Sequence, residues 1–333
     1  MDFATIRQLL SDLAPADEDA AAAARARDVQ LTKPPGSLGK LEDVAAWLAA
    51  WQGRHPPRAE TLHTIVFVGN HGVAARGVSA FPAEVTAQMV ANFEAGGAAI
   101  NQLCDSAGAE LSVEVFDLDR PTADFTSDAA MSEAECAAAI ATGMARVEAG
   151  TDLLCLGEMG IANSTSAAAL ATALFGGDPA DWVGRGTGVD DAGLTRKCDT
   201  IAAATAFHGA ALGDPLEVLR RLGGFELAAI AGAIVGARRA RVPVMLDGFI
   251  CCAAAAVLQR AAPGGLDHCL ASHRSAEAGH DRMLQALGLT PLLDLGMRLG
   301  EGSGAALAAH VVKAAVKTHA GMATFAAAGV SEG

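Results

Sequence analysis

The sequence predicts an α/β protein in which helices cover both faces of a doubly wound, mostly parallel sheet. Short and nearly unbroken apolar runs alternate with longer segments whose apolar residues recur at helical spacing. Such short runs are typical of strands that are buried on both faces. Helical patterns also occupy both ends of the chain. We therefore expect a small helical domain made of residues 1–58 and 305–333, and an α/β catalytic domain of residues 59–304.

Residues 3–54 have a helical pattern that one loop interrupts. Asp17 is a suitable N-cap for the Ala- and Arg-rich stretch 18–29, and residues 38–51 carry apolar side chains at helical spacing. Between these stretches lie residues 32–39 (TKPPGSLG), whose two prolines and two glycines exclude a continuous helix. We expect a structured loop there.

The rest of the chain alternates between expected strands and helices. The apolar runs predicted to be strands are residues 62–68, 111–115, 153–156 and 242–246. The expected helices between and after them are residues 82–104, 132–147, 227–239, 249–258 and, after Gly304, a stretch running to about residue 327. This alternation predicts a parallel sheet, and ligands of such sheets bind beyond the carboxyl ends of the strands.

Composition and charge exclude several classes of function. The chain has 24 Lys and Arg against 38 Asp and Glu, a net charge of −14, which disfavours nucleic acid and anionic membranes as partners. Neither the seven cysteines nor the nine histidines show the spacing of a disulfide framework or a metal site, so we expect no metal and no cofactor. The N-terminal residues lack a signal-peptide pattern and the apolar stretches are too short to span a bilayer, which predicts a cytoplasmic protein.

Polar residues follow two of the predicted strands. In residues 69–82, Ser79 could hydrogen-bond a flat heterocycle, as could Gln88 on the next helix, although an ordinary loop explains both equally well. Glu158 comes directly after an apolar strand, where a buried carboxylate would be costly without a purpose. Residues 163–165 (NST) could cap the next helix, whose free amides attract phosphate.

Two more glycine-rich segments carry candidate residues. Residues 184–197 match neither the P-loop nor GxGxxG, and they lack the acidic Thr-Gly loop of transferases that use a diphosphorylated ribose. Lys197 is a candidate for a monophosphate contact, with a solvated helix lysine as the commoner explanation. In residues 295–304, glycines flank Glu301, and the apolar neighbour Leu299 would raise its pKa toward the range of a general base. An exposed loop glutamate is the alternative.

Seven stretches, taken in order, resemble the nicotinate-nucleotide–dimethylbenzimidazole phosphoribosyltransferase family, which makes the lower ligand of vitamin B12. They are residues 31–42 (LTKPPGSLGKLE), 77–93 (GVSAFPAEVTAQMVANF), 157–165 (GEMGIANST), 184–188 (GRGTG), 246–249 (LDGF), 273–277 (HRSAE) and 299–305 (LGEGSGA). Each alone is a weak signal, but together they span nearly the whole chain in the family's order. Two departures are Asn70, where many relatives have Asp, and Ala162, where Gly is common.

The resemblance implies a Rossmann-like sheet, a small helical domain built from both termini, and a homodimer. It implies that nicotinate mononucleotide gives its phosphoribosyl group to 5,6-dimethylbenzimidazole, with release of nicotinate and formation of α-ribazole 5′-phosphate. On this resemblance Glu301 takes the proton from the attacking base, and Glu158 falls on a second active-site position. Lys197, the backbone at Gly160 and Ser275 would face the phosphate. The residues implied to line the base pocket are Ser79, Gln88, Met159 and Leu299.

Of three alternative functions, one remains open and two are disfavoured. The same transfer onto another base, such as adenine or a phenolic compound, stays open because the sequence does not reveal the size of the pocket. A non-catalytic nucleotide-binding protein on the same fold is disfavoured because Glu301, Glu158 and Lys197 are all present. A nicotinamide-dependent dehydrogenase is disfavoured because residues 69–72 (GNHG) do not provide GxGxxG after the first strand.

Overall fold

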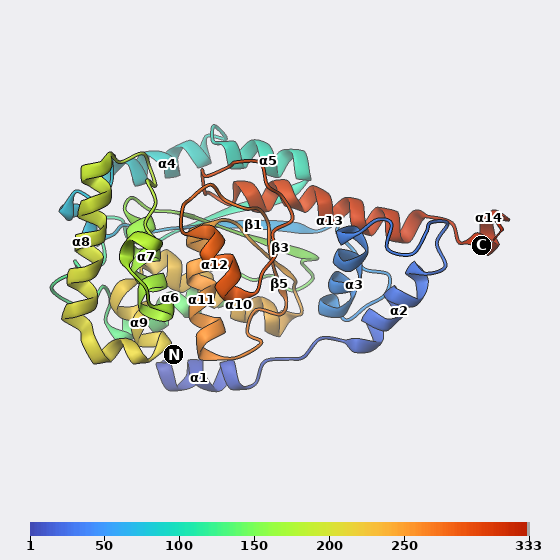
Figure 1. Ribbon diagram of the computed structural model, residues 1–333, viewed down its shortest axis with the longest axis horizontal. Helices are drawn as coiled ribbons and strands as arrows, with labels where there is room; N and C mark the ends of the chain where they lie inside the picture. The colour runs from blue at the N-terminus through green and yellow to red at the C-terminus, as the bar shows by residue number, and fades with distance from the viewer. Residues whose placement is uncertain (332–333) are drawn as a thin grey trace.

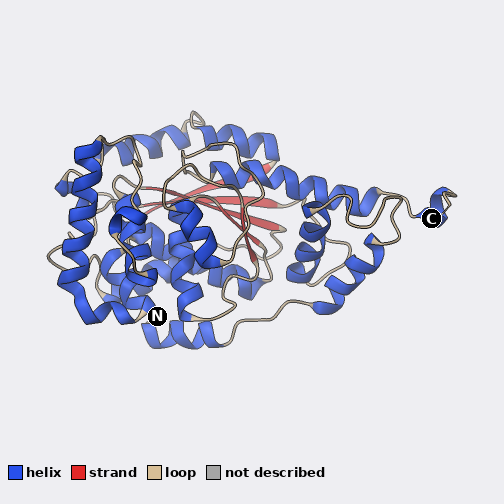
Figure 2. Cartoon of the chain, viewed as in Figure 1, coloured by secondary structure: helices blue, strands red, loops and turns tan. Residues whose placement is uncertain are grey.

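The computed structural model describes residues 1–331, and a five-stranded parallel sheet with helices on both faces forms its centre (Figures 1 and 2). The strands are β1 (Leu62–Val68), β2 (Ala109–Val115), β3 (Leu153–Met159), β4 (Val244–Leu246) and β5 (Cys269–Ala271). They lie in the order β2-β1-β3-β4-β5, and each neighbouring pair is parallel. The predicted doubly wound α/β fold is confirmed.

The switch point of the sheet lies between β1 and β3. Chain order reverses there, because β2 lies on one side of β1 while β3, β4 and β5 follow on the other. Val68 pairs with both Val115 and Met159, so the three strands end at the same edge. Open parallel sheets bind ligands at such a switch point, outside the carboxyl ends of the strands.

One face of the sheet is covered by tightly packed, Ala- and Gly-rich helices. These are α6 (Glu133–Ala145), α7 (Asn163–Phe175), α9 (Pro215–Leu222), α10 (Phe225–Ala240) and α11 (Phe249–Ala261). Helices α6 and α10 approach so closely that a Cβ at Gly143 would lie 1.8 Å from the carbonyl oxygen of Ala229. Side chains of β1 and β3, such as Phe67 and Leu156, pack into this layer.

The opposite face carries α3 (Lys40–Gln52), α4 (Glu84–Glu94), α5 (Ala99–Ala107) and α13 (Ser303–Gly321). Alternate residues of β1, such as Val66 and Val68, point into this second layer, as the period of two in a strand requires. Helices α8 (Asp191–His208) and α12 (His280–Leu287) lie outside the two layers nearest the sheet (Figure 1). None of the helices within residues 1–331 combines the length and hydrophobicity of a membrane span.

The expectation of one helix over residues 82–104 is wrong, because α4 ends at Glu94 and α5 begins at Ala99. Gly96 between them has φ +74°, which a glycine adopts at no steric cost. A Cβ at Gly97 would lie 2.3 Å from the Asn92 side-chain oxygen. The two glycines therefore turn the chain between the helices.

Segments from both ends of the chain meet at one end of the molecule, where α2 (Glu18–Asp28) and α3 lie beside the end of α13 and α14 (Phe325–Ala328) (Figure 1). Asp17 caps α2 as predicted, accepting a hydrogen bond from the Ala20 amide. Helix α1 (Phe3–Ser11) lies elsewhere, against α6 and α11, and its apolar side chains join the main core. The division into residues 1–58 plus 305–333 and residues 59–304 stays a prediction.

Candidate active site

A cavity of about 310 Å³ opens at the carboxyl edge of the sheet, beyond the ends of β3, β4 and β5. Its walls come from the segments that follow β3, β4 and β5 and from the loop that precedes α13. The predicted site residues that line it are Glu158, Met159, Gly160, Ser275, Leu299 and Glu301. Leu299 and Phe81 are about half exposed there, which gives the cavity an apolar mouth.

Glu301 lies in the loop before α13 with a left-handed backbone, φ +64°, between two glycines that also have positive φ. Its side chain is buried, and its Oε2 has no hydrogen-bond partner among the described residues. Burial, together with the charge of Asp247, raises the pKa of Glu301 to about 7. A carboxyl group with this pKa exchanges protons readily near neutral pH.

Gly157 on β3 makes room for the backbone of this loop. A Cβ at Gly157 would lie 2.5 Å from the Gly302 nitrogen and 2.6 Å from the carbonyl carbon of Glu301. Any side chain at residue 157 would therefore displace the peptide that follows Glu301. The glycine before Glu158 thus has a steric role in the site.

Glu158 lies at the end of β3 and is buried beside Glu301. The Asn163 side-chain amide donates a hydrogen bond to its Oε2, and its Oε1 packs against Gly300, where a Cβ would lie 2.5 Å away. Burial first, and then the charge of Asp247, raise the pKa of Glu158 well above its usual range, while the hydrogen bond from Asn163 opposes this rise. The direction of this shift favours the protonated form of Glu158 over the ionised form.

Lys197 lies on α8 behind the cavity wall and does not line the cavity. Its ammonium group is buried and donates hydrogen bonds to Ser164 Oγ and to the Gly184 carbonyl, both at 3.0 Å. Burial lowers the pKa of Lys197 to about 8, and the charge of Glu277 opposes this effect. Because Ser164 does line the cavity, it separates the Lys197 charge from the space that a ligand would occupy.

Ser79 and Gln88 also lie outside the cavity wall. The Ser79 hydroxyl is 3.2 Å from the hydroxyl of Thr187, a residue that does line the cavity. Gln88 is exposed on α4. The structure therefore brings Ser79 to the rim through Thr187 and leaves Gln88 further out.

A buried chain of polar side chains supports the wall at Gly160. Ser166 Oγ lies 2.9 Å from His71 Nδ1, and His71 Nε2 lies 2.7 Å from a carboxylate oxygen of Glu226. A Cβ at Gly160 would meet the Gly69 carbonyl oxygen at 2.4 Å and His71 at 3.4 Å. The order Ser-His-Glu resembles a hydrolase triad, but the His71 and Glu226 side chains have no exposed surface. This chain therefore fixes the loop after β1 against α7 and α10.

Sequence reasoning missed the role of Asp247, which follows β4 directly. One carboxylate oxygen accepts a hydrogen bond from the Gly302 amide at 3.2 Å, and the other accepts one from the Ala305 amide at 3.1 Å. His273 Nε2 lies 3.5 Å from Asp247 and itself lines the cavity. The signal that singled out Glu158, an acid directly after an apolar strand, was also present at Asp247. Arg298 was missed as well; it lines the cavity and donates to the Gly186 carbonyl at 3.3 Å.

Fold and cavity together define an enzyme of the α/β class whose site works with buried carboxyl groups. Three acids, Glu158, Asp247 and Glu301, gather at the carboxyl ends of β3 and β4, and each is at most 6% exposed. The loop after β1 has no GxGxxG, so a dinucleotide is not the expected ligand. A group with a pKa near 7 beside the cavity suits the transfer of one proton.

Comparison with known proteins identifies the family. A phosphoribosyltransferase family model matches residues 13–330. The nicotinate-nucleotide–dimethylbenzimidazole phosphoribosyltransferase of Ruegeria sp. (strain TM1040) is 60% identical over 327 residues, which cover 98% of this chain and 97% of that relative. The enzyme of the same name from Novosphingobium aromaticivorans is 60% identical over 331 residues, covering 99% of this chain and 98% of that relative.

A solved structure agrees with these relatives. The crystal structure of the nicotinate-nucleotide–dimethylbenzimidazole phosphoribosyltransferase from Thermus thermophilus matches with a TM-score of 0.86 at 43% identity, covering 95% of this chain and all of that one. This chain belongs to the nicotinate-nucleotide–dimethylbenzimidazole phosphoribosyltransferase family and is a phosphoribosyltransferase. The resemblance of the seven sequence stretches is confirmed.

Proposed function

We propose that the enzyme transfers the 5-phosphoribosyl group of nicotinate mononucleotide to 5,6-dimethylbenzimidazole and releases nicotinate and α-ribazole 5′-phosphate. The observation that carries this proposal is Glu301, a buried carboxyl group at the cavity wall with a pKa of about 7. The names of the relatives supply the two substrates.

The reaction needs one proton acceptor and accurate placement of the two substrates. A ring nitrogen of the benzimidazole attacks C1′ of the ribose, and the bond from C1′ to the nicotinate nitrogen breaks, its electron pair staying on nicotinate. The bound nicotinate carries a positive ring nitrogen and leaves as a neutral pyridine, so no acid is required to assist it. Attack from the opposite side inverts C1′ and gives the α product. Glu301 takes the proton from the second ring nitrogen of the base.

The cavity walls support a place for each substrate. The amides around Gly160 and the start of α7 are suited to the phosphate, as is the hydroxyl of Ser275. Lys197 supports the phosphate from behind, through Ser164. Burial raises the pKa of Glu158, and in its protonated form Glu158 can donate a hydrogen bond to the ribose beside Glu301.

The acceptor base is placed at the apolar side of the cavity. Met159 and Leu299 line it together with Phe81, and flat aromatic rings bind well against such side chains. Ser79 and Gln88 keep their proposed role as contacts of the base. That role requires both the loop around residues 79–81 and the part of α4 that carries Gln88 to approach the bound base, because neither side chain lines the cavity in this structure.

We also propose a cytoplasmic homodimer. Helices α2 and α14 lie beyond α3, at the end of the molecule away from the sheet (Figure 1). Val29 and Val330 are 66% and 50% exposed there, which leaves apolar surface for a second copy. Sedimentation at micromolar concentration tests this, and a monomer at that concentration would contradict it.

Incubation of the purified protein with nicotinate mononucleotide and 5,6-dimethylbenzimidazole, followed by chromatography, tests the function. Nicotinate and α-ribazole 5′-phosphate should appear in equal amounts. Glu301→Gln should reduce kcat by roughly 10²- to 10⁴-fold, the usual range for a lost general base, with binding of the nucleotide retained. Glu94→Gln, on the exposed end of α4, is the control and should behave as the unaltered enzyme.

Two outcomes would change the assignment. Release of nicotinate without α-ribazole 5′-phosphate would indicate a different acceptor, such as adenine or a phenol. Full turnover by Glu301→Gln would remove Glu301 as the base.

A further inference from the structure

Helix α13 begins without a capping side chain of its own. Its N-cap is Gly302, with φ +82°, and no side chain from its own first residues bonds its free amides. The first amides of a helix need acceptors, and an unpaired buried amide is costly. The first turn of α13 is buried, so the acceptors must come from elsewhere in the protein.

Asp247 supplies these acceptors from the end of β4. Its side chain is buried, and its two oxygens accept from the amides of Gly302 and Ala305 at 3.2 and 3.1 Å. Gly302 is the residue directly after Glu301. The carboxylate therefore fixes the peptide that carries the proposed base, although Asp247 and Glu301 are 54 positions apart in the sequence.

Two other strands hold the same turn from different sides. Gly157 of β3 packs on the peptide between Glu301 and Gly302. After β5, the His273 ring packs on Gly304, where a Cβ would lie 2.1 Å from the ring. Since β3, β4 and β5 are neighbours in the sheet, the sheet itself sets the position of this turn.

The groups around Glu301 also set its charge state. The titratable side chains beside it are Glu158 of β3, Asp247 directly after β4 and His273 after β5, with Glu277 and Arg298 elsewhere on the cavity wall. A negative charge on Asp247 opposes a second negative charge on Glu301 and so raises the pKa of Glu301.

We propose that Asp247 is a positioning residue for Glu301, which holds the start of α13 against the end of β4 and acts on the Glu301 carboxyl through its charge. This inference rests on the proposed role of Glu301 as the base. It assigns Asp247 no contact with either substrate.

The first test compares Asp247→Asn with Asp152→Asn. Asp152 also accepts hydrogen bonds from two backbone amides, those of Glu60 and Thr61, both at 2.9 Å, but at the opposite edge of the sheet. Each variant loses one charge. Asp152 accepts both amides on the single oxygen Oδ2, which Asn can reproduce, whereas Asp247 accepts one amide on each oxygen, so that Asn keeps only one of the two acceptors. Asp247→Asn should lower kcat by roughly 10- to 100-fold, because a small displacement of a catalytic group has effects of that size, with the KM for nicotinate mononucleotide nearly unchanged. It should also move the limb of the pH–rate profile that belongs to Glu301 toward lower pH.

If Asp247 had a merely structural role, Asp247→Asn would change stability without moving the Glu301 limb of the pH–rate profile, as we expect of Asp152→Asn. Equal behaviour of the two variants would therefore overturn the proposal. Asp247→Glu keeps the charge but shifts the oxygens. It should leave the limb near its original pH while kcat falls.

A second measurement does not depend on turnover. In protein labelled with ¹³C at glutamate carboxyl groups, the signal lost in Glu301→Gln identifies Glu301, and its pH titration gives the pKa directly. Asp247→Asn should lower that pKa, and an unmoved titration would overturn the electrostatic part of the proposal. Absence of product from the unaltered enzyme, by contrast, would reject the proposed function and leave this titration still decisive for Asp247.

A third measurement needs no variant and applies even if Asp247→Asn does not fold. The Gly302 and Ala305 amides should exchange with solvent as slowly as the amides of the buried strands in the unaltered protein. Fast exchange of both amides would show that Asp247 does not hold them, and the proposal would fail.

Discussion

Glu301 is held in a strained backbone conformation and in an environment that opposes the ionised form of its carboxyl group. Left-handed backbone at a residue other than glycine costs about 1 kcal/mol or more. Burial next to the charge of Asp247 raises the cost of the negative form, which is why the pKa rises to about 7. Such strain at a functional position is typical of groups whose reactivity the fold has adjusted.

Glu301→Gln should make the protein more stable at high pH. The pKa of Glu301 rises from 4.5 to about 7 on folding, so the folded state binds its proton more tightly than the unfolded state. The stability from this group is present below about pH 4.5 and is lost as the pH rises to 7. Gln carries no charge, so the variant should gain about 1–2 kcal/mol over the unaltered protein at pH 8, below the roughly 3 kcal/mol of the full shift because the cavity admits water.

Urea unfolding of both proteins at pH 5 and pH 8 measures this difference. The gain should be small at pH 5 and larger at pH 8. A gain of the same size at both pH values would show that the effect does not come from ionisation of Glu301.

Ala162 should tolerate Gly and reject β-branched residues. Its φ of +76° lies in the left-handed region, and its side chain is buried directly before α7. Ala162→Gly removes the steric cost but adds freedom to the unfolded chain, so stability should change by less than about 1 kcal/mol. Ala162→Val should lose about 2 kcal/mol or more. Denaturant midpoints measure both, and equal stability of the two variants would contradict this reading of the backbone.

The acidic residues of the candidate site could be predicted from the sequence more fully than the groups they contact. Glu158 and Glu301 stood out because a carboxylate followed an apolar strand or lay among glycines. The link from Asp247 to the amides of α13 could not be predicted, because it depends on where two distant segments meet. Lys197 was predicted as a phosphate contact, and only the fold reveals that Ser164 lies between it and the cavity.

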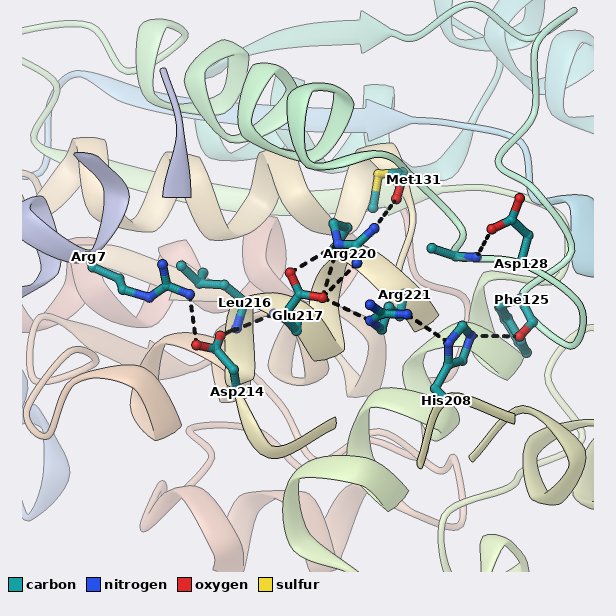
Figure 3. A network of polar contacts seen from close by, with 11 residues as sticks. Arg7, Phe125, Asp128, Met131, His208, Asp214, Leu216, Glu217, Arg220 and Arg221 are labelled. Carbon is teal, nitrogen blue, oxygen red and sulfur yellow. Dashed lines mark hydrogen bonds and ion pairs between the residues drawn. The ribbon is translucent and has the colours of Figure 1, made fainter. Parts of the chain in front are cut away.

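A network of charged side chains joins helices α1, α8 and α9 to the loop before α6 (Figure 3). Asp214 caps α9 through the amides of Leu216 and Glu217 and pairs with Arg7 of α1 at 2.8 Å. Glu217 binds the next two arginines of its own helix, Arg220 at 2.7 Å and Arg221 at 2.8 Å. The network therefore fixes α9 against three neighbouring segments.

His208 at the end of this network is held in its neutral form. Arg221 lies 3.3 Å from its Nδ1 and can only donate, so Nδ1 accepts, and Nε2–H donates to the Phe125 carbonyl at 2.9 Å. Burial first, and Arg221 and Arg220 after it, lower the pKa of His208, while the bond to Phe125 opposes this effect. The stability from this group is present above the unfolded pKa of about 6.5 and is lost as the pH falls below it.

His208→Gln should therefore reduce the acid sensitivity of the fold. The Gln amide can accept from Arg221 and donate to Phe125 without taking up a proton. Between pH 7 and pH 5 the urea midpoint of the unaltered protein should fall further than that of the variant. Parallel falls would indicate that His208 does not change its protonation in this range.

Most elements were predictable because their apolar patterns are strong, and the exceptions have physical reasons. The run 82–104 keeps helical spacing across Gly96 and Gly97, so only the glycines indicate the break. Strand β5 has three residues, Cys269–Ala271, and is too short to give a pattern. It becomes a strand because β4 lies beside it.

Arg238 of α10 connects the α/β body to the end of the molecule where α2, α3 and α14 lie. Its guanidinium donates to the Ala14 carbonyl at 2.5 Å, in the linker between α1 and α2, and it lies over the Trp51 ring of α3 at 4.0 Å. It also lies 3.2 Å from His268 Nδ1. The sequence predicted that both ends of the chain form helices. It could not predict this contact, which joins residues 224 positions apart.

Arg238→Met should loosen the helical end while leaving the sheet folded. Met keeps much of the side-chain volume but removes the hydrogen bonds and the contact of a cation with the Trp51 ring. We expect the free energy of unfolding to fall by about 2–4 kcal/mol, because the variant loses hydrogen bonds to part-buried carbonyls and a desolvated cation–π contact. The neighbouring Arg239 is exposed on the same helix, so Arg239→Met is a matched control that should change stability by less than about 0.5 kcal/mol. Limited proteolysis within residues 12–17 should become several-fold faster in Arg238→Met alone, because local opening frees this linker before the sheet unfolds. If both variants were cleaved at the rate of the unaltered protein, Arg238 would not be the residue that holds the helical end in place.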